Sequence, residues 1–295
     1  MTAITAAEGV RSERPASLWR DTLGTIASQR SAQVGLVLLT LLFTLAIFAP
    51  IIAPFEPTQV LRDVSRREGP SLAHLMGTDA NFRDLFSRVV FGAQTSLQIG
   101  FVTVGFAIVI GTVLGAVAGY AGGVIDNIIM RIMDVFLAFP ALVLAIAIVT
   151  VLGPGLINAM LAIGIVSIPV YARVMRASVL SVRGNDYITA SRALGESSTG
   201  ILFRRILPNS LTPLIVQGTL GIAGAILEVA ALSFLGLGAD PTTAEWGQMI
   251  GAERNQVFNS PHLILFPGLA LALSVLGFNL LGDGIRDALD PRLNR

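Results

Sequence analysis

Few side chains in this sequence have the type and spacing that chemistry requires. The chain contains no cysteine, and its only two histidines, His74 and His262, lie far apart. Thiol chemistry and cysteine-ligated metal sites are therefore excluded, and a histidine-rich metal site is not expected. All 20 basic residues are arginine. Because the phosphate-binding loop of nucleotide hydrolases requires a lysine, the chain is not expected to hydrolyse ATP by that route.

One carboxylate occupies an unusual position in the sequence. Glu228 is the only acidic residue well inside a long apolar stretch. If that stretch crosses a membrane, a charge at its centre costs roughly 2.5–3.5 kcal/mol, and such residues usually face a cavity or a partner. Glu228 could line a path and attract an ammonium group, and Ser233 is assigned to the same path. Alternatively, Glu228 lies near the membrane interface and bonds to a neighbouring helix.

The composition indicates the environment in which these residues lie. Hydrophobic residues make up 53% of the 295 and charged residues 13%, whereas soluble domains carry about a quarter charged residues. Crossing the hydrocarbon layer takes about 20 apolar residues, and the backbone there must satisfy its own hydrogen bonds. We therefore predict an all-α integral membrane protein with six transmembrane helices, near Val34–Ala53, Ser96–Gly119, Ile128–Leu152, Leu156–Tyr171, Leu211–Phe234 and Ile264–Leu281.

Glycine and proline modify these six stretches. The tripeptide at 153–155, Gly-Pro-Gly, favours a turn and separates the third span from the fourth. Three prolines inside or near the ends of spans, Pro140, Pro169 and Pro267, are candidates for kinks. A stripe of glycines at four-residue spacing in the second span lets helix backbones approach closely. This stripe comprises Gly111, Gly115 and Gly119. We favour the interpretation that it packs against another helix of the same chain over the interpretation that it forms a dimer interface.

The arginines indicate the orientation, because cytoplasmic segments of membrane proteins are enriched in basic residues. With both termini in the cytoplasm, 14 of the 20 arginines fall on the cytoplasmic side and 6 outside. The first residues lack the apolar run of a cleaved signal peptide. We therefore divide the chain into a cytoplasmic tail (1–30), a first helix with an external segment (31–95), a core of five helices (96–285) and a cytoplasmic tail (286–295).

The longest predicted cytoplasmic loop, 172–210, contains a helix–glycine–helix pattern. A short amphipathic helix is expected over Asp186–Leu194, followed by Gly195 in the position of a left-handed helix cap. A second helical stretch is expected over Glu196–Arg204. The pattern carries Arg192, Arg204 and Arg205, which could face a partner protein or lipid headgroups. Arg131 and Asp134, at the start of the third span, are expected to anchor the inner interface.

This loop resembles the segment by which the permeases of ABC importers engage their ATPase. The likeness rests on residues 190–195, Ala-Ser-Arg-Ala-Leu-Gly, and on Ile206-Leu207-Pro208-Asn209. Thr189 and Ser191 stand where the family usually has Glu and its second Ala. The resemblance implies that the ATPase contact is made by Asp186, Tyr187, Thr189, Ala190, Ser191, Arg192, Ala193, Leu194, Gly195, Glu196, Leu207 and Pro208.

Three further segments are similar to the C-type permease subunit of dipeptide, oligopeptide and nickel importers. The first is 230–238, Ala-Ala-Leu-Ser-Phe-Leu-Gly-Leu-Gly, with Pro241, Trp246-Gly247 and Met249 after it. The second is the C-terminal run 281–292. The third comprises Gly77-Thr78-Asp79, Arg83-Asp84, Ser87-Arg88 and Ser96-Leu97, with Phe82 where the family has Gly. The likeness covers nearly the whole chain.

The resemblance implies a type I ABC importer permease fold in the bacterial inner membrane and a non-catalytic role. It implies a heterodimer with a homologous B-type permease, two ATPase subunits that bind ATP and Mg, and an extracytoplasmic binding protein that delivers dipeptides or oligopeptides. No cofactor on this chain and no nucleic acid are implied. Asp79, Arg83 and Trp246 are expected to contact the binding protein, although Trp246 also fits an aromatic at the membrane surface.

Alternative functions stay open at this point. The cargo could be a nickel chelate, haem or glutathione, since the binding protein sets most of that choice. A secondary transporter is a remote alternative, because such folds show internal repeats and several intramembrane ionisable groups. An intramembrane enzyme is equally remote, because the sequence contains neither an H-E-x-x-H nor a G-x-S-x-G motif.

Overall fold

The protein is a bundle of long helices, seen in a computed structural model that describes residues 29–289. Within these residues the regular elements are helical, and the single strand-like pairing is an isolated bridge between Thr78 and Asp84. In this described part of the chain, five helices are long and apolar enough to cross a membrane. They are α2 (Arg30–Ile47), α4 (Leu85–Ala121), α7 (Leu156–Arg183), α11 (Thr212–Phe234) and α13 (His262–Leu289).

The sixth candidate span is broken. The sequence predicts one helix over Ile128–Leu152, but the chain forms α5 (Gly123–Leu137) and α6 (Ala141–Leu152), bent by 91°. Pro140 explains the break, because proline has no N–H to donate and disfavours the helical conformation of the residue before it. Pro140 instead precedes the first turn of α6. The predicted third span is thus two helices rather than one, and the kink expected at Pro140 is present.

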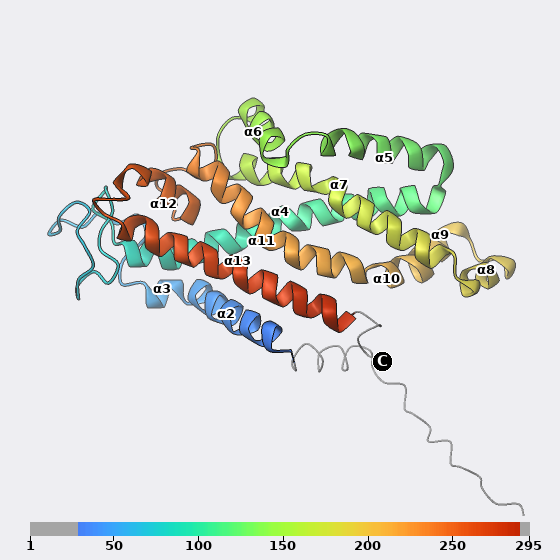
Figure 1. Ribbon diagram of the computed structural model, residues 1–295, viewed down its shortest axis with the longest axis horizontal. Helices are drawn as coiled ribbons and strands as arrows, with labels where there is room; N and C mark the ends of the chain where they lie inside the picture. Colours follow the sequence, from blue (N-terminus) through green and yellow to red (C-terminus); the bar gives the residue numbers. More distant parts are fainter. Residues whose placement is uncertain (1–28, 290–295) are drawn as a thin grey trace, which may run out of the picture.

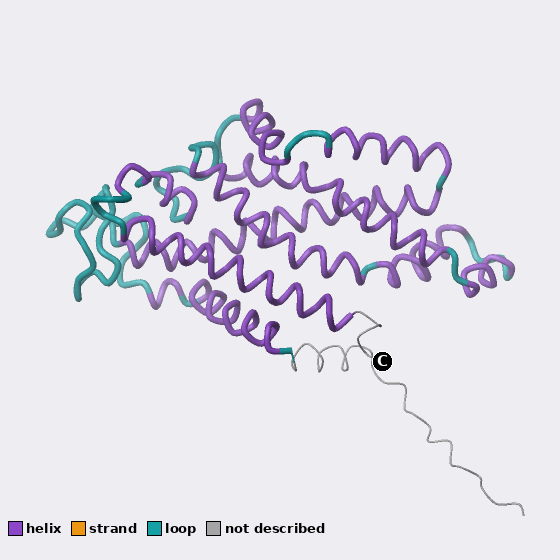
Figure 2. The backbone as a smooth tube through the Cα atoms, viewed as in Figure 1, coloured by secondary structure: helices purple, strands orange, loops and turns teal. Residues whose placement is uncertain are grey.

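The long helices run side by side, and the bundle has two distinct ends (Figures 1 and 2). One end carries the loops of segment 53–84 and α12 (Trp246–Ala252), and we call it the α12 end. The opposite end carries α8 (Asp186–Ala193), and we call it the α8 end. Elsewhere in the bundle, the Gln29 amide donates a hydrogen bond of 2.6 Å to Asp287. The start of α2 and the end of α13 are therefore adjacent.

The short elements are α3 (Ala49–Ile52), α9 (Ser198–Gly200), the π-helical turn η1 (Ile201–Ile206), α10 (Leu207–Ser210) and the 3₁₀ turn η2 (Arg254–Gln256). The first predicted span is thus α2 followed by α3, with Phe48 between them.

Several helices extend beyond the apolar stretches that predicted them. The second begins at Leu85 rather than Ser96, where the Asp84 carboxylate accepts a hydrogen bond of 2.7 Å from Ser87 N as the N-cap. The fourth continues through Pro169 to Arg183 rather than ending at Tyr171, and the sixth continues to Leu289. Apolar composition marks only the lipid-facing part of a helix, whereas backbone hydrogen bonding continues until a cap or a breaker ends it.

The glycine stripe of α4 packs against α7 of the same chain. A Cβ atom added at Gly115 would lie 2.3 Å from the carbonyl oxygen of Ala172, and at Gly111 it would lie 2.6 Å from Tyr171 Cβ. Gly119 faces Arg176 and Val179 in the same way. This close approach confirms that the stripe serves packing within the chain, and it makes α4 and α7 the central pair of the bundle.

Candidate functional site

The α8 end presents a short helix that is mostly exposed. Ile188 is the one buried residue of α8, and it belongs to the apolar core that also contains Ile201 and Ile206. The remaining side chains face outward, including Tyr187, and Leu194 just after the helix is 88% exposed. One apolar anchor therefore holds α8 to the bundle while most of its surface stays open to a partner.

Gly195 fixes the direction in which α8 leaves the next helix. Its φ is +81°, in the left-handed region that glycine adopts without a steric penalty. The Glu196 N–H donates to the Ser191 carbonyl and the Gly195 N–H to the Arg192 carbonyl, each at 3.1 Å. This pair of bonds is a Schellman cap. The predicted helix–glycine–helix geometry is confirmed.

The second helix of this element is longer than the sequence predicts. It runs through α9, η1 and α10 to Ser210 instead of ending at Arg204, so Leu207 and Pro208 lie within it. Ser197 caps its start by accepting from Gly200 N, and Glu196 pairs with Arg205 at 3.3 Å. Thr189 is exposed, and so are Arg192 and Arg204. Within residues 29–289, neither arginine forms an ion pair.

The two predicted path residues have different surroundings. Glu228 is half-buried on α11, and no hydrogen bond or ion pair within the described chain reaches its carboxylate. The expected bond to a neighbouring helix is therefore not seen. Gly224, one helical turn away, has open space where a side chain would lie, so α11 is uncovered beside Glu228.

Ser233, by contrast, is 3% exposed, and its hydroxyl accepts a hydrogen bond from Ala239 N at 3.1 Å. The structure corrects its assignment to a path, because a buried and bonded hydroxyl of this kind stabilises the turn after α11.

Two ion pairs between α5 and α7 were not identified from the sequence. Arg176 and Asp126 pair through two hydrogen bonds, the Nη2–Oδ2 bond being 2.6 Å. Arg173 and Asp134 pair at 2.6 Å with both side chains about half exposed. The interface role expected for Asp134 thus involves Arg173, while Arg131 is exposed. The sequence spacing gives no signal for these pairs, because the two acids lie about two turns apart and the two arginines about one.

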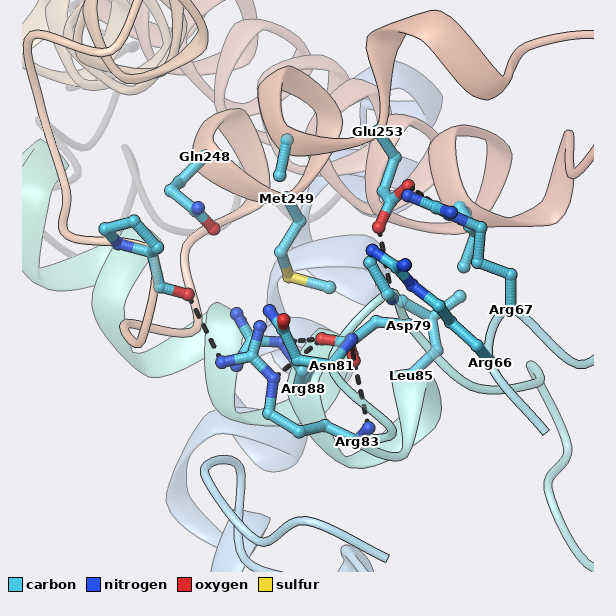
Figure 3. A pocket seen from close by; sticks show the side chains of 14 residues that line it. Arg66, Arg67, Asp79, Asn81, Arg83, Leu85, Arg88, Gln248, Met249 and Glu253 are labelled. Atoms are coloured by element: carbon cyan, nitrogen blue, oxygen red, sulfur yellow. Dashed lines mark hydrogen bonds and ion pairs between the residues drawn. The ribbon is translucent and has the colours of Figure 1, made fainter. Parts of the chain in front are cut away.

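At the α12 end, charged side chains surround a cavity of about 220 Å³ (Figure 3). Asp79 lies at its centre, 2.7 Å from Arg83 Nε and 3.6 Å from Arg88 Nε. Arg88 is buried within α4 and donates to the carbonyls of Pro57, Thr242 and Thr243. It thereby ties the start of α4 to two loops that are distant in sequence. Asp79 and Arg83, predicted to contact a binding protein, are buried and line this cavity.

Trp246 contributes to the same end of the bundle but from the inside. The indole is 1% exposed, and its Nε1 donates a hydrogen bond of 3.0 Å to the Val89 carbonyl. A contact with a binding protein and a position at the membrane surface both require an exposed ring, and the ring is buried in this structure. The preceding Glu245 caps α12 by accepting from the N–H groups of Gly247 and Gln248, and burial raises the pKa of its carboxyl.

Comparison with known protein families gives matches over two stretches of the chain. Residues 111–295 match the family described as binding-protein-dependent transport system inner membrane component. Residues 17–70 match the N-terminal TM domain of oligopeptide transport permease C.

Curated relatives align over nearly their full lengths. The chain is 48% identical to a dipeptide transport system permease protein of Alkalihalophilus pseudofirmus, covering 94% of this chain and 91% of the relative. It is 46% identical to a di/tripeptide transport system permease protein of Pseudomonas aeruginosa, covering 91% and 90%. It is 42% identical to a glutathione transport system permease protein of Pectobacterium atrosepticum, covering 96% and 94%.

A solved structure shares the fold. The inward-facing MetNI methionine ABC transporter aligns with a TM-score of 0.57 at 20% identity, covering 69% of this chain and 97% of that chain. At this identity the likeness shows the fold alone, and it confirms the helical fold class expected from the sequence.

Proposed function

The chain belongs to the family of binding-protein-dependent transport system inner membrane components, and from this premise we propose that it is the permease subunit of an ATP-driven peptide importer. It forms half of a translocation path and does not hydrolyse ATP itself. Partner ATPase subunits bind ATP and Mg and supply the energy. A second, homologous permease supplies the other half of the path, and an extracytoplasmic binding protein delivers the cargo.

The observation that carries this proposal is α8, with its exposed surface and its fixed angle at Gly195. ATP can drive transport only if its binding favours one state of the path over the other. The change must then reach the long helices through a rigid part. Helix shifts of roughly 1–2 Å suffice to switch an interface. In this chain, α8 joins the core through Ile188, and α10 leads directly into α11, which carries Glu228.

Short peptides are the cargo class that we propose. The curated relatives named for dipeptides are 45–48% identical to this chain, and those named for glutathione are 42–43% identical. Glutathione is itself a small peptide with a free ammonium group, so it is the second candidate. The uncovered face of α11 beside Glu228 would meet the partner permease, and its carboxylate would face the ammonium end of the cargo.

The proposed orientation places the α8 end in the cytoplasm of a bacterium and the α12 end outside. Segment 172–210 then meets the ATPase subunits, and segment 54–84 meets the binding protein. The arginine distribution supports this orientation through the enrichment of basic residues in cytoplasmic segments. The inner membrane is the corresponding location.

Cross-linking tests the proposed ATPase contact directly, because the chain has no cysteine of its own. Leu194→Cys places a thiol at an 88% exposed position beside α8, and Leu72→Cys places one at a fully exposed position at the α12 end. With the assembled transporter and a short bifunctional reagent, Leu194→Cys should cross-link to an ATPase subunit, and Leu72→Cys should not. Equal cross-linking of both variants, or none at Leu194→Cys, would contradict the proposal.

A further inference from the structure

The cavity at the α12 end has more positive than negative side chains. Four arginines line it, namely Arg66, Arg67, Arg83 and Arg88, but only two carboxylates do, those of Asp79 and Glu253. Figure 3 shows Arg83 and Arg88 beside Asp79 and Arg67 beside Glu253, with Gln248 and Met249 of α12 on the facing wall. Arg83 and Arg88 are buried, so water screens their charges only weakly.

Both carboxylates are already engaged by partners within the chain. Asp79 accepts hydrogen bonds from Asn81 N, Arg83 N and Arg83 Nε at 2.7–2.9 Å, and it also pairs with Arg88. Glu253 accepts from Arg67 Nε at 2.9 Å and from Ala80 N at 3.1 Å. Arg66, by contrast, forms no ion pair within the described chain and is exposed at the rim. Arg83 and Arg88 also donate to loop carbonyls, so Arg66 is the lining arginine that has no ion-pair partner within the described chain.

The backbone around the cavity is held in an uncommon conformation. Arg67 has φ +55° and Phe82 has φ +57°, and they are the only non-glycine residues with positive φ in the described chain. Both donate a backbone hydrogen bond to the Asp79 carbonyl at 3.3 Å. Left-handed backbone is strained for non-glycine residues, and such residues tend to cluster at functional sites. The backbone beside the cavity is thus held in place by two hydrogen bonds to one carbonyl.

We propose that this cavity binds a carboxylate presented by an acidic side chain on the docking face of the binding protein. This inference rests on the proposed function, and it specifies the chemical group that the binding protein presents to this chain. The volume of about 220 Å³ accommodates a carboxylate with its stem. Arg66 and the Gln248 amide provide donors of the kind that bind carboxylates.

The position of the cavity favours a docking partner over the cargo. Its lining comes from residues 66–88 and 241–263, and no lining residue comes from α7 or α11. The cavity therefore lies apart from the face of α11 that carries Glu228, where we place the path. A group that docks at the mouth can enter and leave from outside, whereas cargo bound here would lie off its route.

The test measures binding of the cargo-loaded binding protein to the complete transporter in nanodiscs, by biolayer interferometry at low and high salt. Arg66→Gln should raise the apparent Kd roughly three- to tenfold, and Arg66→Glu should raise it more, since rim charges act mainly on association and its salt dependence. The dependence on salt should become weaker in both variants. Arg62→Gln is the matched control, an exposed arginine of the same segment outside the cavity, and it should leave Kd unchanged.

A second arm separates the two sources of a carboxylate. The measurement is repeated with the binding protein loaded with a peptide whose C-terminus is amidated, and the effect of Arg66→Gln should persist. Its disappearance would show that the cargo supplies the carboxylate and would overturn the inference. An unchanged Kd in both Arg66 variants would also overturn it, while the proposed function would survive. Failure of any binding protein to bind the wild-type transporter would instead contradict the proposed function.

Discussion

Single residues decide how closely the central helices approach. Gly115 of α4 faces the backbone of α7, and a Cβ there would lie 2.3 Å from Ala172 O and 2.8 Å from Met175 Cβ. Because a backbone carbonyl cannot rotate away as a side chain can, the two helices would have to separate. Gly105, on the same helix, has no atom within 4 Å of such a Cβ. Two glycines of α4 therefore have opposite structural importance.

Gly115→Ala should destabilise the protein by about 1–3 kcal/mol through overpacking. Gly105→Ala should be neutral or slightly stabilising, because alanine favours helix by up to about 1 kcal/mol over glycine. The measurement is the melting temperature of the purified transporter in detergent. Equal melting temperatures for the two variants would show that the contact between α4 and α7 is not tight at Gly115.

Glu228 is the residue for which the chemistry of the cargo matters most. If its carboxylate faces the ammonium end of a peptide, Glu228→Gln should lower uptake of peptides with a free N-terminus by about three- to tenfold, since one charged contact is lost. Uptake of peptides with a blocked N-terminus should change little. Both rates are measured in cells with radiolabelled peptides, at matched amounts of transporter in the membrane. Unchanged uptake kinetics for both kinds of peptide would show that Glu228 does not contact the ammonium end of the cargo.

At the scale of elements, short helices and helix breaks set the angles between neighbouring parts of the bundle. The angle between α8 and the following helix depends on one glycine, and the turn between α5 and α6 depends on one proline. Asp126 and Asp134 of α5 form ion pairs with two arginines of α7, and these pairs hold α5 against α7. These joints are local, so each can be changed without altering the spans.

Gly195→Val should abolish uptake and reduce co-purification of the ATPase subunits, while the chain still inserts in the membrane. No atom lies within 4 Å of the added Cβ, so the effect would come from backbone strain, about 1–2 kcal/mol in the left-handed region. Gly195→Asn should retain more ATPase, because asparagine tolerates this region better than other residues.

The matched control is Gly236→Val. Gly236 has a φ of +80° and equally open space around an added Cβ, but it lies at the α12 end. It should leave retention of the ATPase subunits unchanged. Normal uptake together with normal ATPase retention in Gly195→Val would show that Gly195 does not set the angle of a coupling helix.

The whole molecule is polarised along the bundle axis (Figure 1). At the α12 end, Arg83 and Arg88 are buried and donate to loop carbonyls, which holds segment 53–84 against the helices. At the α8 end, arginines and apolar side chains remain exposed. A rigid surface at the α12 end suits the docking of a binding protein, and exposed side chains at the α8 end suit assembly with ATPase subunits.

Single-cysteine labelling tests this polarity in intact cells. Leu72→Cys should react with a membrane-impermeant maleimide added from outside, and Ser198→Cys should react only after the membrane is permeabilised. Both positions are exposed in the isolated chain, so accessibility differs only through the membrane. Labelling of Ser198→Cys from outside would reverse the proposed orientation.

The sequence by itself determined the class of the protein, the positions of its apolar stretches and the joint at Gly195. These features depend on properties of neighbouring residues, namely hydropathy over a span and the backbone freedom of glycine. The bend at Pro140 was predicted as a kink, but its size of 91° was not, because it depends on how α6 packs against α7.

Only the tertiary structure decided which polar and aromatic residues are exposed. Trp246 and Ser233 looked like surface or path residues, yet both are buried. The indole of Trp246 is bonded to Val89, which lies 157 positions away, and Arg88 is held by carbonyls of two distant loops. Contacts between residues so far apart leave no periodic signal in the chain, because burial follows from the packing of whole helices and not from the local sequence.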